Sequence, residues 1–108
     1  MKKLILIAVL ILFGTSVSAT GETVFVKYRG PVDLSPFTCY DTESSVVHRI
    51  CYWDSKAYLV VLLNSTYYHY CRIPDSTVRS WLAAPSKGRF YTASVKGNYD
   101  CRLGGIPN

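Results

Sequence analysis

The residues with the clearest chemistry in this chain are its cysteines and histidines. The sequence has 108 residues, with four cysteines and two histidines. An even number of cysteines predicts two disulfides if the protein reaches an oxidising compartment, whereas cysteines combined with histidines can bind zinc. The zinc alternative does not follow the paired C-x-x-C spacing of common zinc sites, so we favour disulfides. The residues concerned are Cys39, Cys51, Cys71, Cys101, His48 and His69.

Tyrosines and arginines form the second set of residues that could do chemistry. The chain has nine tyrosines and six arginines, and these side chains stack on bases and bind phosphates. A competing interpretation makes Tyr68 and Tyr70 core residues beneath a helix. The two histidines could pair across the sheet as a pH sensor or be ordinary polar positions. The candidate binding surface comprises Tyr68, Tyr70, Arg72, Lys87, Arg89 and Lys96.

The first 19 residues have the three-part layout of a secretory signal peptide. Lys2 and Lys3 form a positive start, residues 4–13 are apolar, and residues 17–19 are small or slim residues before a cleavage site. The apolar run is shorter than the roughly 20 residues that cross a bilayer. We therefore expect a secreted protein, periplasmic or extracellular. Its net charge falls from +5 to +3 when the two lysines leave.

Three strands are predicted to position the candidate residues. Branched, aromatic and apolar runs indicate strands at residues 46–53, 57–63 and 67–73. Their short connections favour an antiparallel meander. Side chains alternate along a strand, so Tyr68 and Tyr70 share one face and Cys71 lies on the other.

Two helices are predicted to follow the strands. Pro74 suits the first turn of a helix, and the apolar spacing after it gives one stripe that packs on the sheet. Pro85 ends this helix. Ser86 can cap a second, shorter helix over residues 87–96, and Gly97 stops it.

These elements predict an α+β fold with two disulfides. We expect a three-stranded antiparallel meander with both C-terminal helices on one face. An N-terminal arm, residues 20–43, and a C-terminal tail, residues 100–108, would be tied to the other face. The arm begins with a strand-like pattern at residues 23–29 and is irregular at residues 32–38.

The meander also limits the disulfide pairing. Cys51 and Cys71 would lie on its two outer strands, about 10 Å apart, which is beyond the roughly 7 Å that a disulfide spans. That pairing is disfavoured, so Cys39 and Cys101 should each bond one strand cysteine. Which bonds which is left open by the sequence.

Short motifs occur in a recognisable order over residues 44–99. They are Ser44-Ser45, Ile50, Tyr52, Tyr68-His-Tyr70, Ile73-Pro74, Ala84-x-Ser86-x-Gly88-x-Phe90-Tyr91 and Val95-Lys96. Together they resemble the KTSC domain, which is named after the C-terminus of some lysyl-tRNA synthetases. Flanking segments at residues 32–39 and 96–102 resemble the exported, four-cysteine versions of this domain.

The resemblance implies little about activity. The function of the domain is not established, and RNA binding has been suggested for it through its association with the synthetases. The carboxylates and serines of this chain fall in predicted turns and caps, so no catalytic set, metal site or cofactor is assigned. We expect a non-enzymatic binding module for an envelope protein or an anionic polymer. RNA or another nucleic acid is the alternative, which a charge of only +3 does not demand.

The signal peptide gives the first testable prediction. Expressed with its own N-terminus in a secreting host, the protein should lose residues 1–19 and begin at Thr20. Intact mass and N-terminal sequencing of the exported protein measure this. An Ala19→Tyr variant should accumulate as precursor, because the peptidase requires a small residue there. Exported protein that still begins at Met1 would contradict the prediction.

Overall fold

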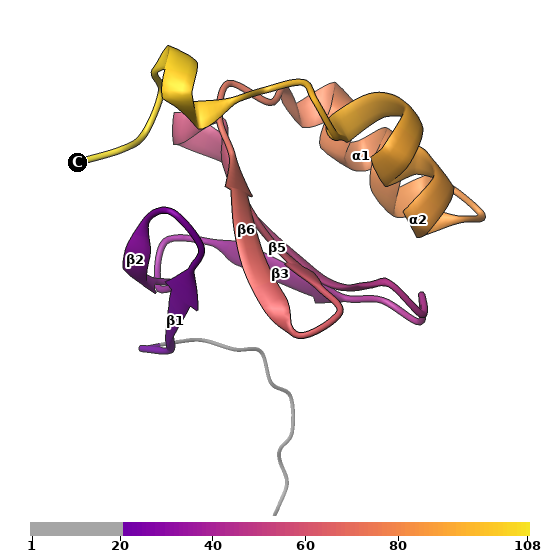
Figure 1. Ribbon diagram of the computed structural model, residues 1–108, viewed down its shortest axis with the longest axis horizontal. Coiled ribbons are helices and arrows are strands. Elements are labelled where there is room, and N and C mark those ends of the chain that lie inside the picture. Colours follow the sequence, from indigo (N-terminus) through magenta and orange to yellow (C-terminus); the bar gives the residue numbers. More distant parts are fainter. Residues whose placement is uncertain (1–20) are drawn as a thin grey trace, which may run out of the picture.

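A six-stranded mixed sheet with two helices on one face forms the body of the protein (Figure 1). The computed structural model describes residues 21–108, so the predicted signal peptide lies outside the described residues. The strand order is β2-β1-β6-β5-β4-β3. The α+β class is confirmed, but the prediction of only three strands is wrong.

The predicted meander forms the centre of the sheet. Strands β4 (Val47–Trp53), β5 (Tyr58–Leu63) and β6 (Thr66–Tyr70) pair antiparallel in sequence order. The continuous apolar run of β5 suits a central strand that is covered on both faces. Five of its six residues are buried, which confirms this interpretation.

The N-terminal arm supplies the three additional strands. β1 (Thr23–Val26) and β2 (Gly30–Asp33) form a hairpin, and β3 (Thr38–Asp41) pairs antiparallel with β4. β1 falls within the strand-like pattern expected at residues 23–29, whereas β2 and β3, with four residues each, are too short for a periodic pattern to show. Pro31 lies within β2, where it is tolerated because β2 is the edge of the sheet. The irregular arm expected at residues 32–38 is therefore partly wrong.

The helices lie where the sequence predicts them. α1 (Asp75–Ala83) is followed by α2 (Lys87–Phe90), which continues as one π-helical stretch over Tyr91–Val95. The Ser86 hydroxyl caps α2 by accepting a backbone N–H at 3.2 Å. Gly97 ends the helix with a φ of +81°, a conformation that favours glycine. Short 3₁₀ turns occur at Asp54–Lys56 and Cys101–Leu103. No helix in the described part of the chain is long and apolar enough to cross a membrane.

The sheet has a hydrophobic core on each face. The helix-side core is built around the fully buried Trp81, whose indole N–H donates to the Lys87 carbonyl at 3.0 Å. The opposite core is smaller and is covered by the arm and the tail, as expected. Its buried members are Val26, Val32, Leu34, Cys51, Tyr58, Val60, Cys71 and Cys101.

Both disulfides lie in the core opposite the helices. Cys39 bonds Cys51 across the β3–β4 pair, with Cα atoms 4.0 Å apart. Cys71, just after β6, bonds Cys101 in the tail, with Cα atoms 4.9 Å apart. The exclusion of a Cys51–Cys71 bond is confirmed, and the connectivity that the sequence left open is resolved.

Loop length predicts unequal contributions from the two disulfides. The chain-entropy relation gives about 3 kcal/mol for a 12-residue separation and about 4 kcal/mol for a 30-residue separation. Replacing Cys71 and Cys101 by serine should therefore lower the free energy of unfolding more than replacing Cys39 and Cys51. Urea denaturation of the two double variants measures both losses of unfolding free energy. A larger loss in the Cys39, Cys51 variant would contradict an entropic origin of the disulfide stabilisation.

Candidate functional site

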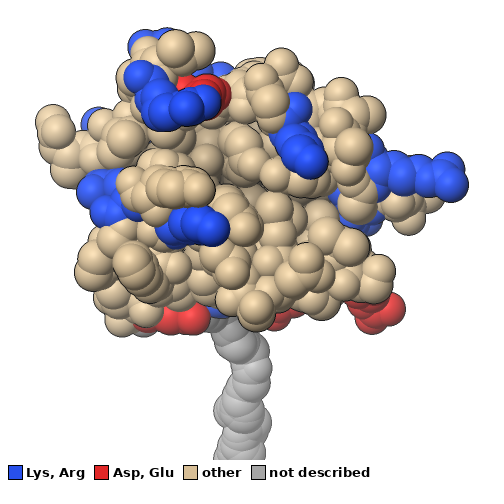
Figure 2. Space-filling model, viewed as in Figure 1, with Lys and Arg blue, Asp and Glu red and all other residues tan. Residues whose placement is uncertain are grey.

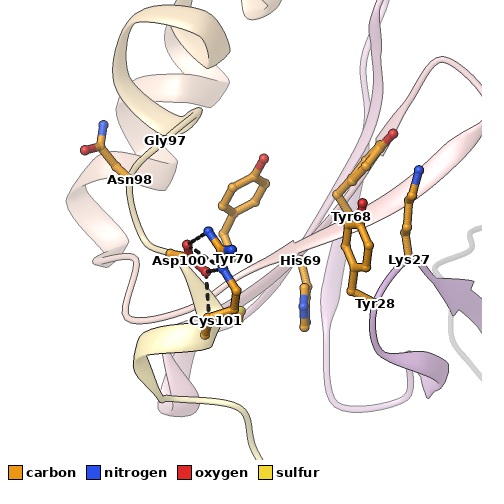
Figure 3. Close-up of a pocket in the computed structure, with 10 residues that line it drawn as sticks. Lys27, Tyr28, Tyr68, His69, Tyr70, Gly97, Asn98, Asp100 and Cys101 are labelled. Carbon is orange, nitrogen blue, oxygen red and sulfur yellow. Dashed lines mark hydrogen bonds and ion pairs between the residues drawn. The ribbon is translucent and has the colours of Figure 1, made fainter.

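A pocket of about 510 Å³ opens beside β6, where three segments distant in the sequence meet (Figure 3). The turn after β1 supplies Lys27 and Tyr28 on one side. The segment between Gly97 and Arg102 forms the other side, and β6 forms the floor between them. The pocket therefore depends on the hairpin, on the meander and on the disulfide that holds the tail.

Tyr68 and Tyr70 line the pocket and also pack on the helix-side core. Both are half-buried, so they are partly core residues and partly pocket wall. The hydroxyls of Tyr70 and Tyr91 lie 2.6 Å apart and share a hydrogen bond. Burial, with the bond to Tyr91, raises the pKa of Tyr70 well above its usual value, so this phenol is neutral at physiological pH.

Charged groups flank the aromatic rings. The Lys27 ammonium lies 5.4 Å from the ring centre of Tyr28 and 5.9 Å from that of Tyr68. Across the pocket, the Arg102 guanidinium binds the Asp100 carboxylate at 2.6 Å. Hydrogen bonds from Arg102 lower the pKa of Asp100 to about 2, so this pair is ionised and internally neutral. Lys27 forms no ion pair with any residue of the described chain, which leaves one uncompensated positive charge.

His69 is on the floor of the pocket and is uncharged at neutral pH. Its Nδ1 lies 2.8 Å from the hydroxyl of the buried Tyr58. Burial, and next the positive charge of Arg29, lower its pKa below the usual value. His48 lies at an irregularity in β4, two strands away, so the two histidines do not form the cross-sheet pair considered from the sequence.

The structure separates the predicted basic residues from the tyrosines. The Arg72 side chain lies against Gly104 and Gly105 in the tail. Lys87 donates to the Ala84 carbonyl at 2.7 Å. Arg89 and Lys96 are exposed in and just after the second helical segment. None of these four lines the pocket, and Figure 2 shows separate cations rather than one basic strip on this face.

The predicted binding surface did not include the charged and aromatic pocket residues Lys27, Tyr28 and Arg102, nor Gly97, Asn98 and Asp100 beside them. A local signal existed for one of them. Lys27-Tyr28-Arg29 ends the strand-like pattern directly before Gly30, which marks an exposed turn with basic and aromatic side chains. Arg102 had no such signal, because its position depends on the disulfide beside it.

The pocket offers aromatic and charged groups to a partner. All four cysteines are in disulfides, so no thiolate is left to act as a nucleophile or to bind zinc. Among residues 21–108, no three His, Cys, Asp or Glu side chains are grouped so as to hold a metal ion. Aromatic rings beside a single free ammonium suit a partner with an apolar body and an anionic group.

The comparisons with known proteins agree with this fold. The KTSC domain family matches residues 43–99, which is more than half of the chain. The chain belongs to the KTSC domain family. A crystal structure of a KTSC domain protein from Yersinia pestis is similar, with 25% sequence identity and a TM-score of 0.57. That match covers 59% of this chain and 92% of the other. No curated protein matches.

The KTSC motifs meet in space around the helix-side core. The Y-x-Y residue Tyr70 contacts Tyr91 of the helical motif, as described above. Tyr52 donates its hydroxyl to the carbonyl of Ile73, which begins the I-P motif, at 2.7 Å. The KTSC match stops before the tail, so the pocket joins a KTSC wall to segments on either side of the matched range.

The Tyr70–Tyr91 contact gives a prediction about pH. A raised folded-state pKa stabilises the fold fully below the unfolded pKa of about 10, and this stabilisation is lost as pH rises above it. A Tyr70→Phe variant should lose about 1 kcal/mol at neutral pH because a hydrogen bond is removed. Its stability should then fall less steeply than that of the wild type in alkaline buffer. Denaturation at several pH values measures both slopes, and equal slopes would contradict the assignment.

Proposed function

We propose that this KTSC domain protein is an exported, non-enzymatic binding module and that the pocket beside β6 receives its partner. The observation that carries the proposal is the composition of the pocket. It places the centres of the exposed Tyr28 ring and the half-buried Tyr68 ring 5.4 Å and 5.9 Å from the Lys27 ammonium, which forms no ion pair in the described part of the chain. Aromatic anchors beside one free charge are typical of sites where binding energy is concentrated.

Export is supported by the cysteines and by the predicted signal peptide. Two disulfides in a domain of this size are compatible with a protein that works outside the cytoplasm. The cleaved N-terminus remains the prediction made above. An envelope protein or an anionic polymer is therefore the partner class that we propose.

Nucleic acid is the weaker candidate. Single-stranded nucleic acid needs a continuous positive groove with several stacking rings, because each nucleotide adds a phosphate. The predicted cations of this chain are dispersed, and the pocket adds only one free positive charge. No geometric feature of the protein therefore favours RNA over another anion.

Capture from envelope extract by the mature, oxidised protein tests the proposal. Wild-type protein should retain a component that a Lys27→Ala, Tyr28→Ala double variant loses. A Lys56→Ala variant should still retain this component. The substitution removes one positive charge, as Lys27→Ala does, but from an exposed turn outside the pocket. Retention should weaken with salt if the ammonium contributes.

Equal capture by all three proteins would contradict the proposed site. A single-stranded RNA oligonucleotide serves as the second probe. We expect no retention at low salt, whereas retention with a steep salt dependence would favour the nucleic-acid function instead.

A further inference from the structure

The outer edge of β6 is only partly paired. Along one edge β6 pairs with β5 over its whole length, whereas along the other it pairs with β1 at a single position, Val26 opposite Tyr67. The Lys27 N–H donates to the Tyr67 carbonyl at 2.8 Å, which marks the end of that contact. Beyond β6, the Cys71 N–H donates to the Tyr99 carbonyl, also at 2.8 Å. Between these two bonds no strand of residues 21–108 lies along this edge.

The main chain of His69 points into this gap. In a strand, the N–H and C=O groups of alternate residues face the same edge. Tyr67 and Cys71 both use the outer edge, so His69, which is two positions from each, directs its N–H and C=O there as well. No hydrogen bond from the described part of the chain reaches either group. His69 also lines the pocket, so an unused donor and acceptor face the pocket side by side.

We infer that this pocket binds a short extended peptide of a partner protein, which pairs with His69 as an added strand and carries one carboxylate. The inference rests on the proposed function, because it names the partner class of the same pocket. Strand addition to an open sheet edge is an established mode of peptide recognition, in which main-chain bonds give affinity and flanking side chains give specificity. Here the flanking side chains are Tyr68 and Tyr70 toward the helices and Tyr28 at one end (Figure 3).

The length of the gap limits the bound segment. Four residue steps separate Tyr67 from Cys71, which is about 13 Å at the usual rise per residue of a strand. Lys27 closes one end and Tyr99 the other. About three residues of a peptide therefore pair with the edge, and the rest of the partner must leave the plane of the sheet.

The charge of the gap favours one acidic group. Among the residues that line the pocket, Asp100 and Arg102 compensate each other and His69 is neutral, so Lys27 is the lining cation without an ion pair, with the charge of Arg29 acting on His69 from outside the lining. A peptide with one carboxylate near Lys27 balances this charge, whereas the repeated phosphates of a nucleic acid would have only one free cation to meet. Charge complementarity and the open main-chain groups therefore point to the same kind of partner.

A random heptapeptide library displayed on phage is the probe. Selection on the mature, oxidised protein should enrich sequences with an extended, β-branched stretch and one Asp or Glu. For a selected peptide made by synthesis, methylation of the one main-chain nitrogen that donates to His69 should weaken binding by about three- to tenfold. The same peptide should slow amide hydrogen exchange of the His69 N–H in the protein.

Two substitutions at one position separate the main chain from the side chain. His69→Pro removes the N–H that faces the gap. Peptide binding should weaken by about tenfold, because one main-chain hydrogen bond to the peptide is lost and the proline ring obstructs the edge of β6. No ladder bond to β5 is lost, because this N–H points away from β5. His69→Ala also loses the side chain but keeps the N–H, so it should bind the peptide more tightly than His69→Pro, and the difference measures the main-chain contribution. The methylated peptide keeps the test valid if the proline variant does not fold.

The inference is overturned if no peptide is enriched, or if every methylated peptide binds as well as its parent. It is also overturned if exchange at His69 does not change, or if sedimentation shows that a second copy of the protein fills the edge. These outcomes are distinguishable from failure of the proposed function, which would show as capture from envelope extract that does not depend on Lys27 and Tyr28. If the envelope component still depends on Lys27 and Tyr28 while no peptide binds, the pocket is a binding site for a non-peptide anion.

Discussion

Strand β5 is buried on both faces, and this two-sided burial determines what the rest of the chain must provide. One face receives two helices that bury Trp81, which is enough apolar area for an ordinary core. The other face receives only short strands and a tail. A domain of this size buries a limited share of its surface, so two disulfides on this face supplement a small core. The pocket lies at a sheet edge where the two cores approach each other, with Tyr70 packed on the helix-side core and Cys101 in the opposite core.

The part of the fold that follows local patterns could be predicted from the sequence. The apolar run of β5, the Ser86 cap and the stop at Gly97 each act over a few residues, and each was placed correctly. The exclusion of a Cys51–Cys71 bond needed only the spacing of strands. The alternating pattern at residues 23–29 indicated β1, but β2 and β3 could not be predicted, because they are four residues long and their pairing is decided by distant partners. The single-residue contact of Val26 with Tyr67 leaves no periodic signal.

Only the pocket residues that belong to a sequence motif could be predicted. The Y-x-Y pattern identified Tyr68 and Tyr70, and the structure shows that they are both core and pocket wall. The basic residues that were expected near these tyrosines do not line the pocket. Arg72 has a φ of +57° just after β6, and its side chain lies against the tail rather than in the pocket. Residues far away in the sequence take its place, because the hairpin turn and the tail are brought to β6 by tertiary pairing.

The Cys71–Cys101 disulfide also holds one wall of the pocket against the sheet. Cys101 is part of the pocket wall, and the bond joins this wall to the end of β6 across 30 positions of the sequence. Apart from the disulfide, the tail is held by the Cys71 N–H bond to Tyr99 and by a bond from Arg29 to the Pro107 carbonyl. The wall that carries Cys101 is therefore joined covalently to the sheet only when two thiols are oxidised. A reduced chain keeps the strand but relies on those hydrogen bonds for the opposite wall, so the redox state of one cysteine pair bears on how firmly this surface is assembled.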